Sequence, residues 1–340
     1  MDSITQIALG AAVGEAALGR KVGNKAVLWG AVAGTIPDLD VIPGQFLSTL
    51  QELEFHRGAS HSIVFSVIMA PILGYLVYRL HKNSGASWRG WTLLFFLSLI
   101  THPVLDCLTT WGTQFFWPLD YRVDLKSISV IDPLYTLPLL ITTIWLMFKS
   151  RSGRGRRVLN VIGISLSSFY LIFTLGNKAM IHQIFEEELE RQNISYNRFD
   201  TRPTLFNNIL WTSNVEADSG YYLGYYSFLD PDESIHFRYI HKNEELLGEV
   251  ENEPKVKRLL KITQDWYTLE KEGELLLVND LRFGQTMIWP DENERFVFTY
   301  TIEKDNGEVI IGQRENDFSQ GTELLSQLWH RLKGHKNPPR

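Results

Sequence analysis

Cysteine is almost missing from this sequence, and several familiar catalytic motifs are missing altogether. The chain of 340 residues contains one cysteine, Cys107, so no disulfide can form within it. Its 25 glycines and 13 prolines are ordinary frequencies, which excludes collagen-like and low-complexity proteins. The glycine-rich phosphate loops of dinucleotide-binding and P-loop proteins are absent, and so is the GxSxG motif of acyl-enzyme hydrolases.

The average composition, with 44% hydrophobic residues and a net charge of −6, conceals two halves of opposite character. Residues 1–180 carry 15 Lys and Arg against 10 Asp and Glu, whereas residues 181–340 carry 18 against 29. Two runs rich in glycine and alanine, 3–14 and 26–37, predict a close-packed helical hairpin. Longer uncharged runs approach the ~20 residues that cross a bilayer, which favours membrane helices over the core helices of a soluble protein. These runs are residues 62–78, 90–105, 133–148 and 158–177.

Three short basic loops separate the apolar runs and predict their orientation, because Lys and Arg beside membrane helices stay on the cytoplasmic side. The loops are residues 20–25, 79–89 and 149–157, the last of which reads KSRSGRGRR. We interpret this last run as a topology signal rather than a nucleic-acid-binding patch, and we expect no nucleic-acid partner. The N-terminus is expected to be retained, because Asp2 stands where a signal peptide would be basic.

The predicted fold is a polytopic α-helical membrane domain, residues 1–177, followed by a small extracytoplasmic α+β domain, residues 178–340. The membrane domain is expected to have both termini outside the membrane and the lipid bilayer as its partner. Six membrane helices are predicted, at roughly residues 3–19, 25–36, 60–79, 90–111, 128–148 and 157–177.

Alternating apolar and polar residues predict strands in the second half, at residues 221–229 and 295–302. Residues 305–307 read DNG, a turn signal that predicts a hairpin after the second of these strands. Apolar residues between 254 and 270 fit one face of a helix. A small α+β domain accounts for this pattern.

Histidine and aspartate concentrate in three stretches, which read PDLD (residues 37–40), HRGASHS (56–62) and THPVLD (101–106). Each lies at the outer end of a predicted helix, where ionisable groups are costly and tend to coordinate ions. His102 and Asp106 are four residues apart, so on a helix both can face one metal ion. The set of nitrogen and oxygen donors suits one or two divalent ions, zinc, manganese or iron. The predicted metal ligands are Asp38, Asp40, His56, His61, His102 and Asp106.

Structural roles remain an alternative for each of these residues. The aspartates of PDLD can cap a turn and pair with the histidines of HRGASHS, and His102 can bond to another helix. Asp132 is either a further ligand or orienter of the site, or the N-cap of the fifth helix before Pro133. Ser60 is the predicted N-cap of the helix that begins near His61.

The stretches PDLD, HRGASHS, THPVLDCLTTWGT and SISVIDPLYTLP, in this order, resemble those of the YdjM-like family of membrane-bound metal-dependent hydrolases. The resemblance covers about the first 150 to 180 residues. It implies a bacterial inner-membrane location and a hydrolase activity. Members of that family often carry a histidine shortly after the initiating Met-Asp, where this chain has Gln6.

The predicted function is a membrane-embedded metal-dependent hydrolase that acts at the outer face of the membrane on a lipid-borne ester or phosphoester. Asp40 or Asp132 would serve as the general base, and Arg57 or Arg122 would hold an anionic group of the substrate. The alternative for both arginines is a salt bridge or an interfacial position. A non-catalytic membrane regulator or sensor with a structural metal site is the second hypothesis. Metal or proton transport is a third, and clustering at one face of the membrane disfavours it.

Overall fold

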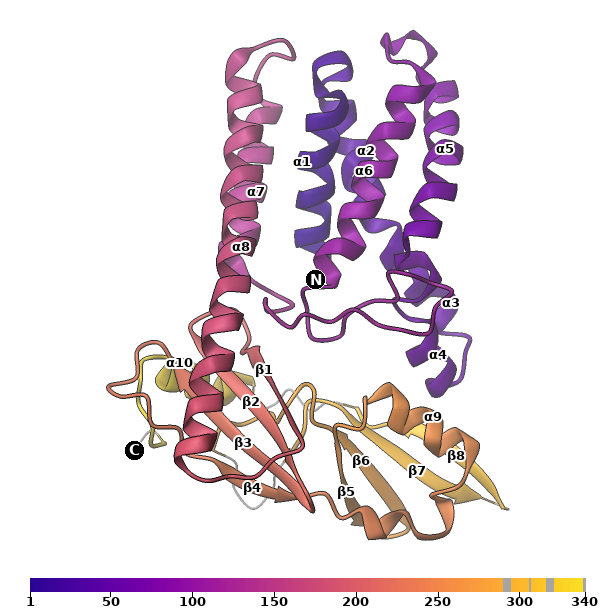
Figure 1. Cartoon of the computed structure of the whole chain (residues 1–340). Coiled ribbons are helices and arrows are strands. Elements are labelled where there is room, and N and C mark those ends of the chain that lie inside the picture. The colour runs from indigo at the N-terminus through magenta and orange to yellow at the C-terminus, as the bar shows by residue number, and fades with distance from the viewer. Residues whose placement is uncertain (290–294, 306, 316–320, 339–340) are drawn as a thin grey trace. The chain divides into compact units, whose positions relative to one another are not determined.

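The computed structural model describes residues 1–289, 295–305, 307–315 and 321–338, and it divides into two compact units (Figure 1). The helical unit comprises Met1–Phe46, Phe55–Asn177 and Leu205–Asn207. The sheet unit comprises Leu47–Glu54, Lys178–Thr204 and Asn208–Arg340.

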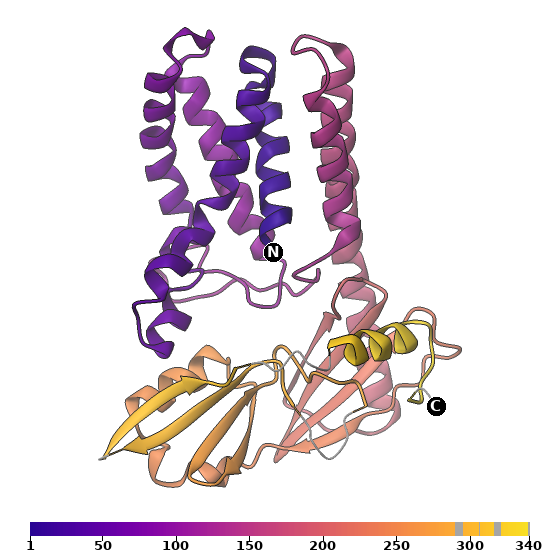
Figure 2. The same ribbon diagram turned by 180° about the vertical axis from the view of Figure 1, so that it is seen from behind.

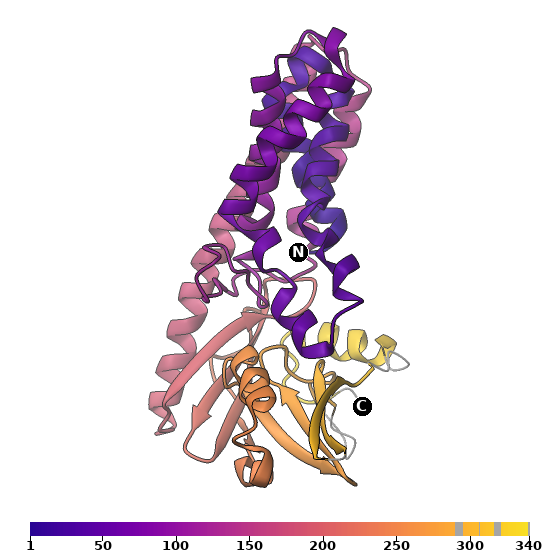
Figure 3. The ribbon, with the colours of Figure 1, turned by 90° about the vertical axis from the view of Figure 1, so that its right-hand side faces the viewer.

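Long helices that run along one common direction make up the helical unit (Figure 3). They are α1 (Ser3–Val22), α2 (Asn24–Thr35), α5 (Ile63–Leu80), α6 (Trp88–Asp106), α7 (Pro133–Met147) and the first part of α8 (Arg154–Arg191). Short helical turns join them at η1 (Pro37–Asp40), α3 (Val41–Gly44), η2 (Ala59–His61) and η3 (Lys82–Ser84).

Glycines let α1 and α2 pack backbone against backbone. A Cβ atom added at Gly10 would lie 2.3 Å from the Gly30 carbonyl oxygen, and one added at Gly34 would lie 2.4 Å from the Gln6 carbonyl oxygen. Interfaces of small residues hold helices together in a bilayer because they allow close van der Waals contact. The close-packed hairpin predicted from the two Gly- and Ala-rich runs is therefore confirmed.

Fewer helices can cross a membrane than the sequence predicted. Among the described residues, α5 and α8 are long and apolar enough to cross a membrane. The helix α2 and the following segment Pro37–Gly44 meet at a bend of 41°, and the two together would form a third span if they cross as one. The prediction of six membrane-crossing helices is not supported. Helices do form in the predicted regions, but α2 and α7 have 12 and 15 residues, fewer than the ~20 that span a bilayer. The sequences of α1 and α6 contain ionisable residues, among them Glu15, Arg89 and Asp106.

Side-chain caps fix where two of the helices begin. Asp132 caps α7, where its carboxylate accepts a hydrogen bond of 3.0 Å from the Leu134 N–H. Ser62 caps α5, where its hydroxyl accepts a hydrogen bond of 3.0 Å from the Phe65 N–H. The prediction of Ser60 as this cap is wrong, because an additional 3₁₀ turn, η2, contains that residue.

The sheet unit contains two four-stranded antiparallel sheets (Figure 2). The first consists, in order, of β1 (Arg198–Pro203), β2 (Leu210–Ala217), β3 (Gly220–Ser227) and β4 (Arg238–His241). The second consists, in order, of β5 (Tyr267–Glu272), β6 (Leu275–Asp280), β7 (Thr299–Asp305) and β8 (Glu308–Gln313). Other elements of this part of the chain are α4 (Thr49–Phe55), η4 (Glu244–Val250), α9 (Pro254–Ile262) and α10 (Gly321–Leu332).

Two predictions for the second half have different outcomes. β7 and β8 pair antiparallel, which confirms the hairpin predicted at the DNG turn, whose Asn306 lies outside the described residues. The helix predicted over residues 254–270 is wrong in its second half. α9 ends at Ile262, and Gln264 and Asp265 adopt left-handed backbone conformations with φ of 57° and 60° that lead the chain into β5.

We expect Gly30→Ala to destabilise the helical unit. The added Cβ would lie 2.2 Å from the Gly10 carbonyl oxygen, and overpacking of this kind costs about 1–3 kcal/mol. Gly176→Ala in α8 is the matched control, because a Cβ there meets nothing within 4 Å. Thermal unfolding of the detergent-solubilised chain should show a lower Tm for Gly30→Ala alone. Equal Tm values for both variants and the wild type would contradict the close packing of α1 on α2.

Candidate metal centre

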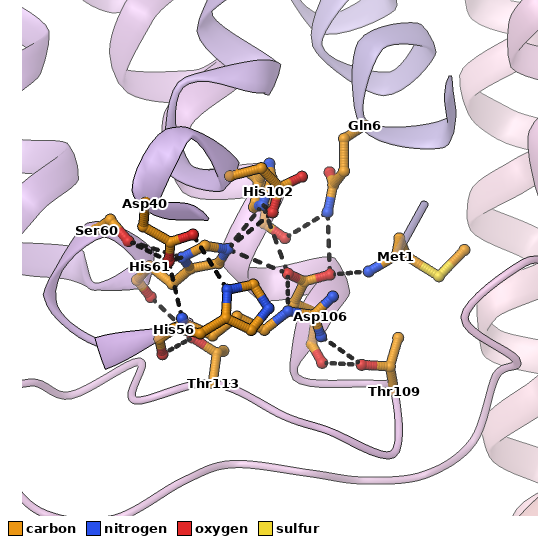
Figure 4. A network of polar contacts seen from close by, with 12 residues as sticks. Met1, Gln6, Asp40, His56, Ser60, His61, His102, Asp106, Thr109 and Thr113 are labelled. Atoms are coloured by element: carbon orange, nitrogen blue, oxygen red, sulfur yellow. Dashed lines mark hydrogen bonds and ion pairs between the residues drawn. The ribbon is translucent and has the colours of Figure 1, made fainter. Parts of the chain in front are cut away.

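Four potential metal ligands from three separate segments converge inside the helical unit (Figure 4 shows the network around them). Asp38 comes from η1, His61 from η2, and both His102 and Asp106 from the end of α6. One donor atom of each lies within 4.8 Å of the others. The side chains of His61, His102 and Asp106 are fully buried, whereas that of Asp38 is 19% exposed. We call these residues the four-donor cluster, and its accessible side is that of Asp38.

Five of the six donor-to-donor distances in the four-donor cluster lie between 3.1 and 3.5 Å. The two His Nε2 atoms are 3.1 Å apart, Asp38 Oδ1 lies 3.3 and 3.4 Å from them, and Asp106 Oδ2 lies 3.5 Å from each. A regular tetrahedron with an edge of about 3.3 Å has its centre about 2.0 Å from each corner, which is the length of a zinc–nitrogen or zinc–oxygen bond. The spacing therefore fits one divalent ion held by two nitrogens and two oxygens.

Hydrogen bonds behind both imidazole rings determine which nitrogen faces the cluster. His102 Nδ1 lies 2.6 Å from the Gly34 carbonyl oxygen and donates to it, because a carbonyl oxygen can only accept. Ser60 donates its hydroxyl hydrogen to Asp40 at 3.1 Å, so at 2.9 Å it accepts from His61 Nδ1. In their neutral forms the two rings present Nε2 lone pairs to each other at 3.1 Å. A cation between them would be ligated by both nitrogens.

Asp106 provides the second observation that favours a cation. Its Oδ1 accepts a hydrogen bond of 3.1 Å from Gln6 Nε2 and contacts the Met1 amino group. Its buried Oδ2 accepts no hydrogen bond within the described part of the chain, although Arg57 Nε lies 3.4 Å away. A buried charged oxygen without a donor is costly, and a metal ion bound to Oδ2 would satisfy it.

The other two predicted ligands, Asp40 and His56, lie behind His61 and outside the four-donor cluster. One oxygen of Asp40 accepts the Arg57 N–H at 2.9 Å, and the other lies 3.1 Å from His56 Nδ1. The His56 side chain is 30% exposed, and its ring centre lies 6.2 Å from that of His61. Asp40 and His56 thus form an aspartate–histidine dyad beside the cluster.

The two predicted substrate-binding arginines make contacts within the protein. Arg57 is buried and adopts a φ of 56°, which is unusual for a residue with a side chain and marks local strain. Its Nη1 donates to Thr109 Oγ1 at 3.3 Å, and its Nε faces Asp106. Arg122 donates to the His56 carbonyl oxygen at 2.9 Å and so fastens the loop before α7 to the segment that carries the dyad.

Asp132, predicted as either a site residue or a helix cap, uses both oxygens in helix contacts. Oδ1 caps α7, and Oδ2 accepts the Tyr170 hydroxyl of α8 at 2.8 Å. The side chain is buried and joins the start of α7 to α8.

Sequence reasoning missed the groups that orient the histidines. The Gly34 carbonyl belongs to the backbone, and no side-chain pattern identifies it. Ser60 was noted only as a helix cap, although its place beside His61 in HRGASHS was visible. In the sequence, Gln6 stands out only because it occupies a place where the similar family often has a histidine. In the structure, its Nε2 donates to Asp106 Oδ1 at 3.1 Å and to the His102 carbonyl oxygen at 3.3 Å.

Exposed apolar side chains flank the accessible side of the cluster. The loop between α6 and α7 packs on the HRGASHS segment, where the Gln114 N–H donates to the Arg57 carbonyl at 3.0 Å and the Ile63 N–H to the Phe115 carbonyl at 3.1 Å. Exposed aromatic and aliphatic residues in such numbers are typical of a membrane interface. Those in η1, in α3 and just after it, and in the loop are Leu39, Val41, Ile42, Phe46, Phe116, Trp117, Leu119 and Tyr121.

Comparison with known proteins gives a family match for the first half of the chain. A family model described as YdjM inner membrane protein matches residues 1–180, which contain the entire four-donor cluster. Inner membrane protein YbcI of Escherichia coli (strain K12) is 34% identical over 101 residues, or 29% of this chain. The aligned segment spans 57% of the length of that curated relative. No solved structure matches the chain.

We expect about one divalent ion per purified wild-type chain, and its loss in His61→Ala and in His102→Asn, because each variant removes one of four donors. His56→Ala is the matched control, since it removes a histidine of the dyad that lies outside the cluster. Elemental mass spectrometry under metal-replete conditions measures the ion, and Tm values confirm that each variant is folded. Equal loss in all three variants, or no metal in the wild type, would contradict the assignment.

Proposed function

This chain belongs to the YdjM inner membrane protein family, and we propose that it is a metal-dependent hydrolase built around the four-donor cluster. One observation carries the proposal. Two Nε2 atoms and the buried Asp106 Oδ2 converge on one point, while the Nδ1 hydrogens of both rings are bonded elsewhere. That arrangement presents lone pairs and negative charge to a cation.

Asp38, His61, His102 and Asp106 would hold a divalent ion such as Zn²⁺, Mn²⁺ or Fe²⁺. When bound, such an ion polarises the scissile group and lowers the pKa of water from 15.7 toward about 7. The residues behind the ligands keep the rings in place and make their Nε2 atoms more basic. The Arg57 guanidinium, 3.4 Å from Asp106 Oδ2, offsets part of the charge of that carboxylate.

His56 is the group best placed to move a proton. Its Nδ1 faces the Asp40 carboxylate at 3.1 Å, which leaves Nε2 to take a proton from water. It is also the partly exposed histidine next to the cluster. In this proposal Asp40 positions His56 and His61 and is not itself the base, and Asp132 serves to cap α7.

The proposed substrate is an ester or phosphoester carried by a membrane lipid. The exposed apolar side chains of η1, α3 and the loop before α7 would place the accessible side of the cluster at the membrane interface. A lipid headgroup could then reach Asp38 while its acyl chains stay in the bilayer.

A non-catalytic regulator or sensor is the second candidate, and the number of donors favours it. Four protein ligands complete the tetrahedral shell of a structural zinc site, whereas a catalytic ion keeps an open position for water. Ions with larger coordination shells, such as Mn²⁺ or Fe²⁺, would keep open positions in the same donor set.

We expect the metal-loaded wild type to hydrolyse at least one member of a panel of lipid esters and phosphoesters in mixed micelles. His56→Gln should retain the metal but lower kcat by 10²–10⁴-fold, the range for loss of a general base. Asp132→Asn is the control and should keep its activity, because Asn also caps helices. A wild type that binds metal but hydrolyses nothing in the panel would favour the regulatory role, and full activity in His56→Gln would refute its role as base.

We also propose that the cluster and the C-terminal half face the outside of the cytoplasmic membrane. The support is the distribution of charge, because the basic loops at residues 20–25, 79–89 and 149–157 lie at the helix ends away from the cluster. If α8 crosses the bilayer from the last of these loops, residues after 178 emerge on the outer side.

Cysteine labelling of intact bacterial cells tests this orientation, with the buried Cys107 as background. Glu274→Cys, in the exposed turn between β5 and β6, should react with a membrane-impermeant maleimide. Asn83→Cys, exposed in η3, should react only after the cells are permeabilised. The reverse pattern would overturn the proposed orientation.

A further inference from the structure

A cavity of about 560 Å³ lies at the far end of α1 from the four-donor cluster. Gln6 contacts Asp106 of the cluster, and Arg20 lines the cavity. These two residues belong to one straight helix, so they lie about 21 Å apart along its axis at 1.5 Å per residue. The end of α1, the loop after α7 and the first turns of α8 form the walls. This loop is the KSRSGRGRR run, which the proposed hydrolase does not use.

Positive charge dominates the cavity. Among the described residues, Arg156 alone of the cavity arginines has a carboxylate partner: its Nε and Nη2 bind the two oxygens of Glu15 at 2.7 and 2.5 Å. Arg151 donates to the Lys21 carbonyl oxygen at 3.0 Å. Within the described residues, the three remaining arginines of the cavity, Arg20, Arg154 and Arg157, form neither hydrogen bonds nor ion pairs. The five that line the cavity are Arg20, Arg151, Arg154, Arg156 and Arg157.

Four exposed guanidinium groups without a carboxylate partner among the described residues concentrate positive charge at this cavity, and they repel one another. An anion with several oxygens would relieve this repulsion, because the planar fork of arginine matches a phosphate through two parallel N–H···O bonds. Asn160 adds a polar group to the wall. Its Nδ2 donates to the Ala12 carbonyl at 3.1 Å, while its buried Oδ1 has no donor among the described residues.

The same cavity has an apolar side that continues along a lipid-facing helix. Ala16, Val161 and Ile164 line it together with the arginines. Farther along α8, which is long and apolar enough to span a membrane, Leu166, Phe169 and Ile172 are also exposed. Basic pockets at the ends of membrane helices lie level with the lipid headgroups, and they attract anionic ones.

We propose that this cavity binds the phosphate of an anionic phospholipid. The guanidinium groups hold the phosphate, and the acyl chains lie along the apolar face of α8. The site is separate from the metal centre and does not depend on the hydrolase proposal. It would tie α1, the loop after α7 and α8 together at one level of the membrane.

The test uses the full-length chain in phosphatidylcholine nanodiscs that contain phosphatidylglycerol, with native mass spectrometry to count retained lipids. Arg154→Gln/Arg157→Gln removes two exposed cavity charges. Arg79→Gln/Arg89→Gln is the matched control, which removes two exposed charges at the loop between α5 and α6, outside the cavity. We expect the first variant to bind phosphatidylglycerol about 30-fold more weakly than the wild type, which corresponds to a loss of about fivefold for each of the two arginines. The control should bind within about twofold of the wild type.

Two results would overturn the proposal. Equal weakening in both double variants would mean that general surface charge, and not the cavity, attracts the lipid. Saturation of the same arginines by inorganic phosphate, with no preference of the chain for phosphatidylglycerol over phosphatidylcholine, would mean that the cavity takes free anions and not a lipid.

Discussion

The backbone contact between α1 and α2 is the constraint on which the metal centre depends. Gly34 takes part in both features: an added Cβ would collide with the Gln6 carbonyl, and its own carbonyl accepts the His102 Nδ1 hydrogen. Because the glycines let α1 and α2 approach closely, the Gly34 carbonyl lies where it fixes the tautomer of His102 on α6. Gln6, held on the facing side of α1, donates to Asp106 from the same interface. A larger residue at Gly34 would displace both groups together.

The helical unit carries two unbalanced sets of polar groups, at opposite ends of α1. Near Gln6 the buried Asp106 Oδ2 has no hydrogen-bond donor among the described residues, and two imidazole nitrogens face each other at 3.1 Å. Near Arg20 exposed guanidinium groups without a carboxylate partner among the described residues line one cavity. Buried charge is costly without a partner of the opposite sign, and crowded surface charge of one sign attracts such a partner. The proposed cation at one end and the proposed anionic lipid at the other would supply these partners.

The sequence predicted the meeting of PDLD, HRGASHS and THPVLD, because each lies at a helix end that faces the same side. The i, i+4 spacing of His102 and Asp106 on α6 also placed both on one face. It could not separate Asp38 from Asp40, or His61 from His56, because these choices depend on side-chain directions in two 3₁₀ turns and in the turn that follows α4. The number of spans was overestimated, since the length of an apolar run does not show where its helix ends or which polar residues interrupt it.

The dyad of Asp40 and His56 is what a purely structural metal site leaves unexplained. A structural ion needs its four ligands and the groups that orient them, and Asp40 already serves this purpose through Ser60 and His61. A second oxygen of the same carboxylate holds His56, which lies outside the four-donor cluster, is 30% exposed and stands beside the cluster. Stability gains little from an ion pair that is partly exposed to water. A histidine held by a carboxylate and open to water is suited to proton transfer. The dyad therefore favours catalysis over a structural ion.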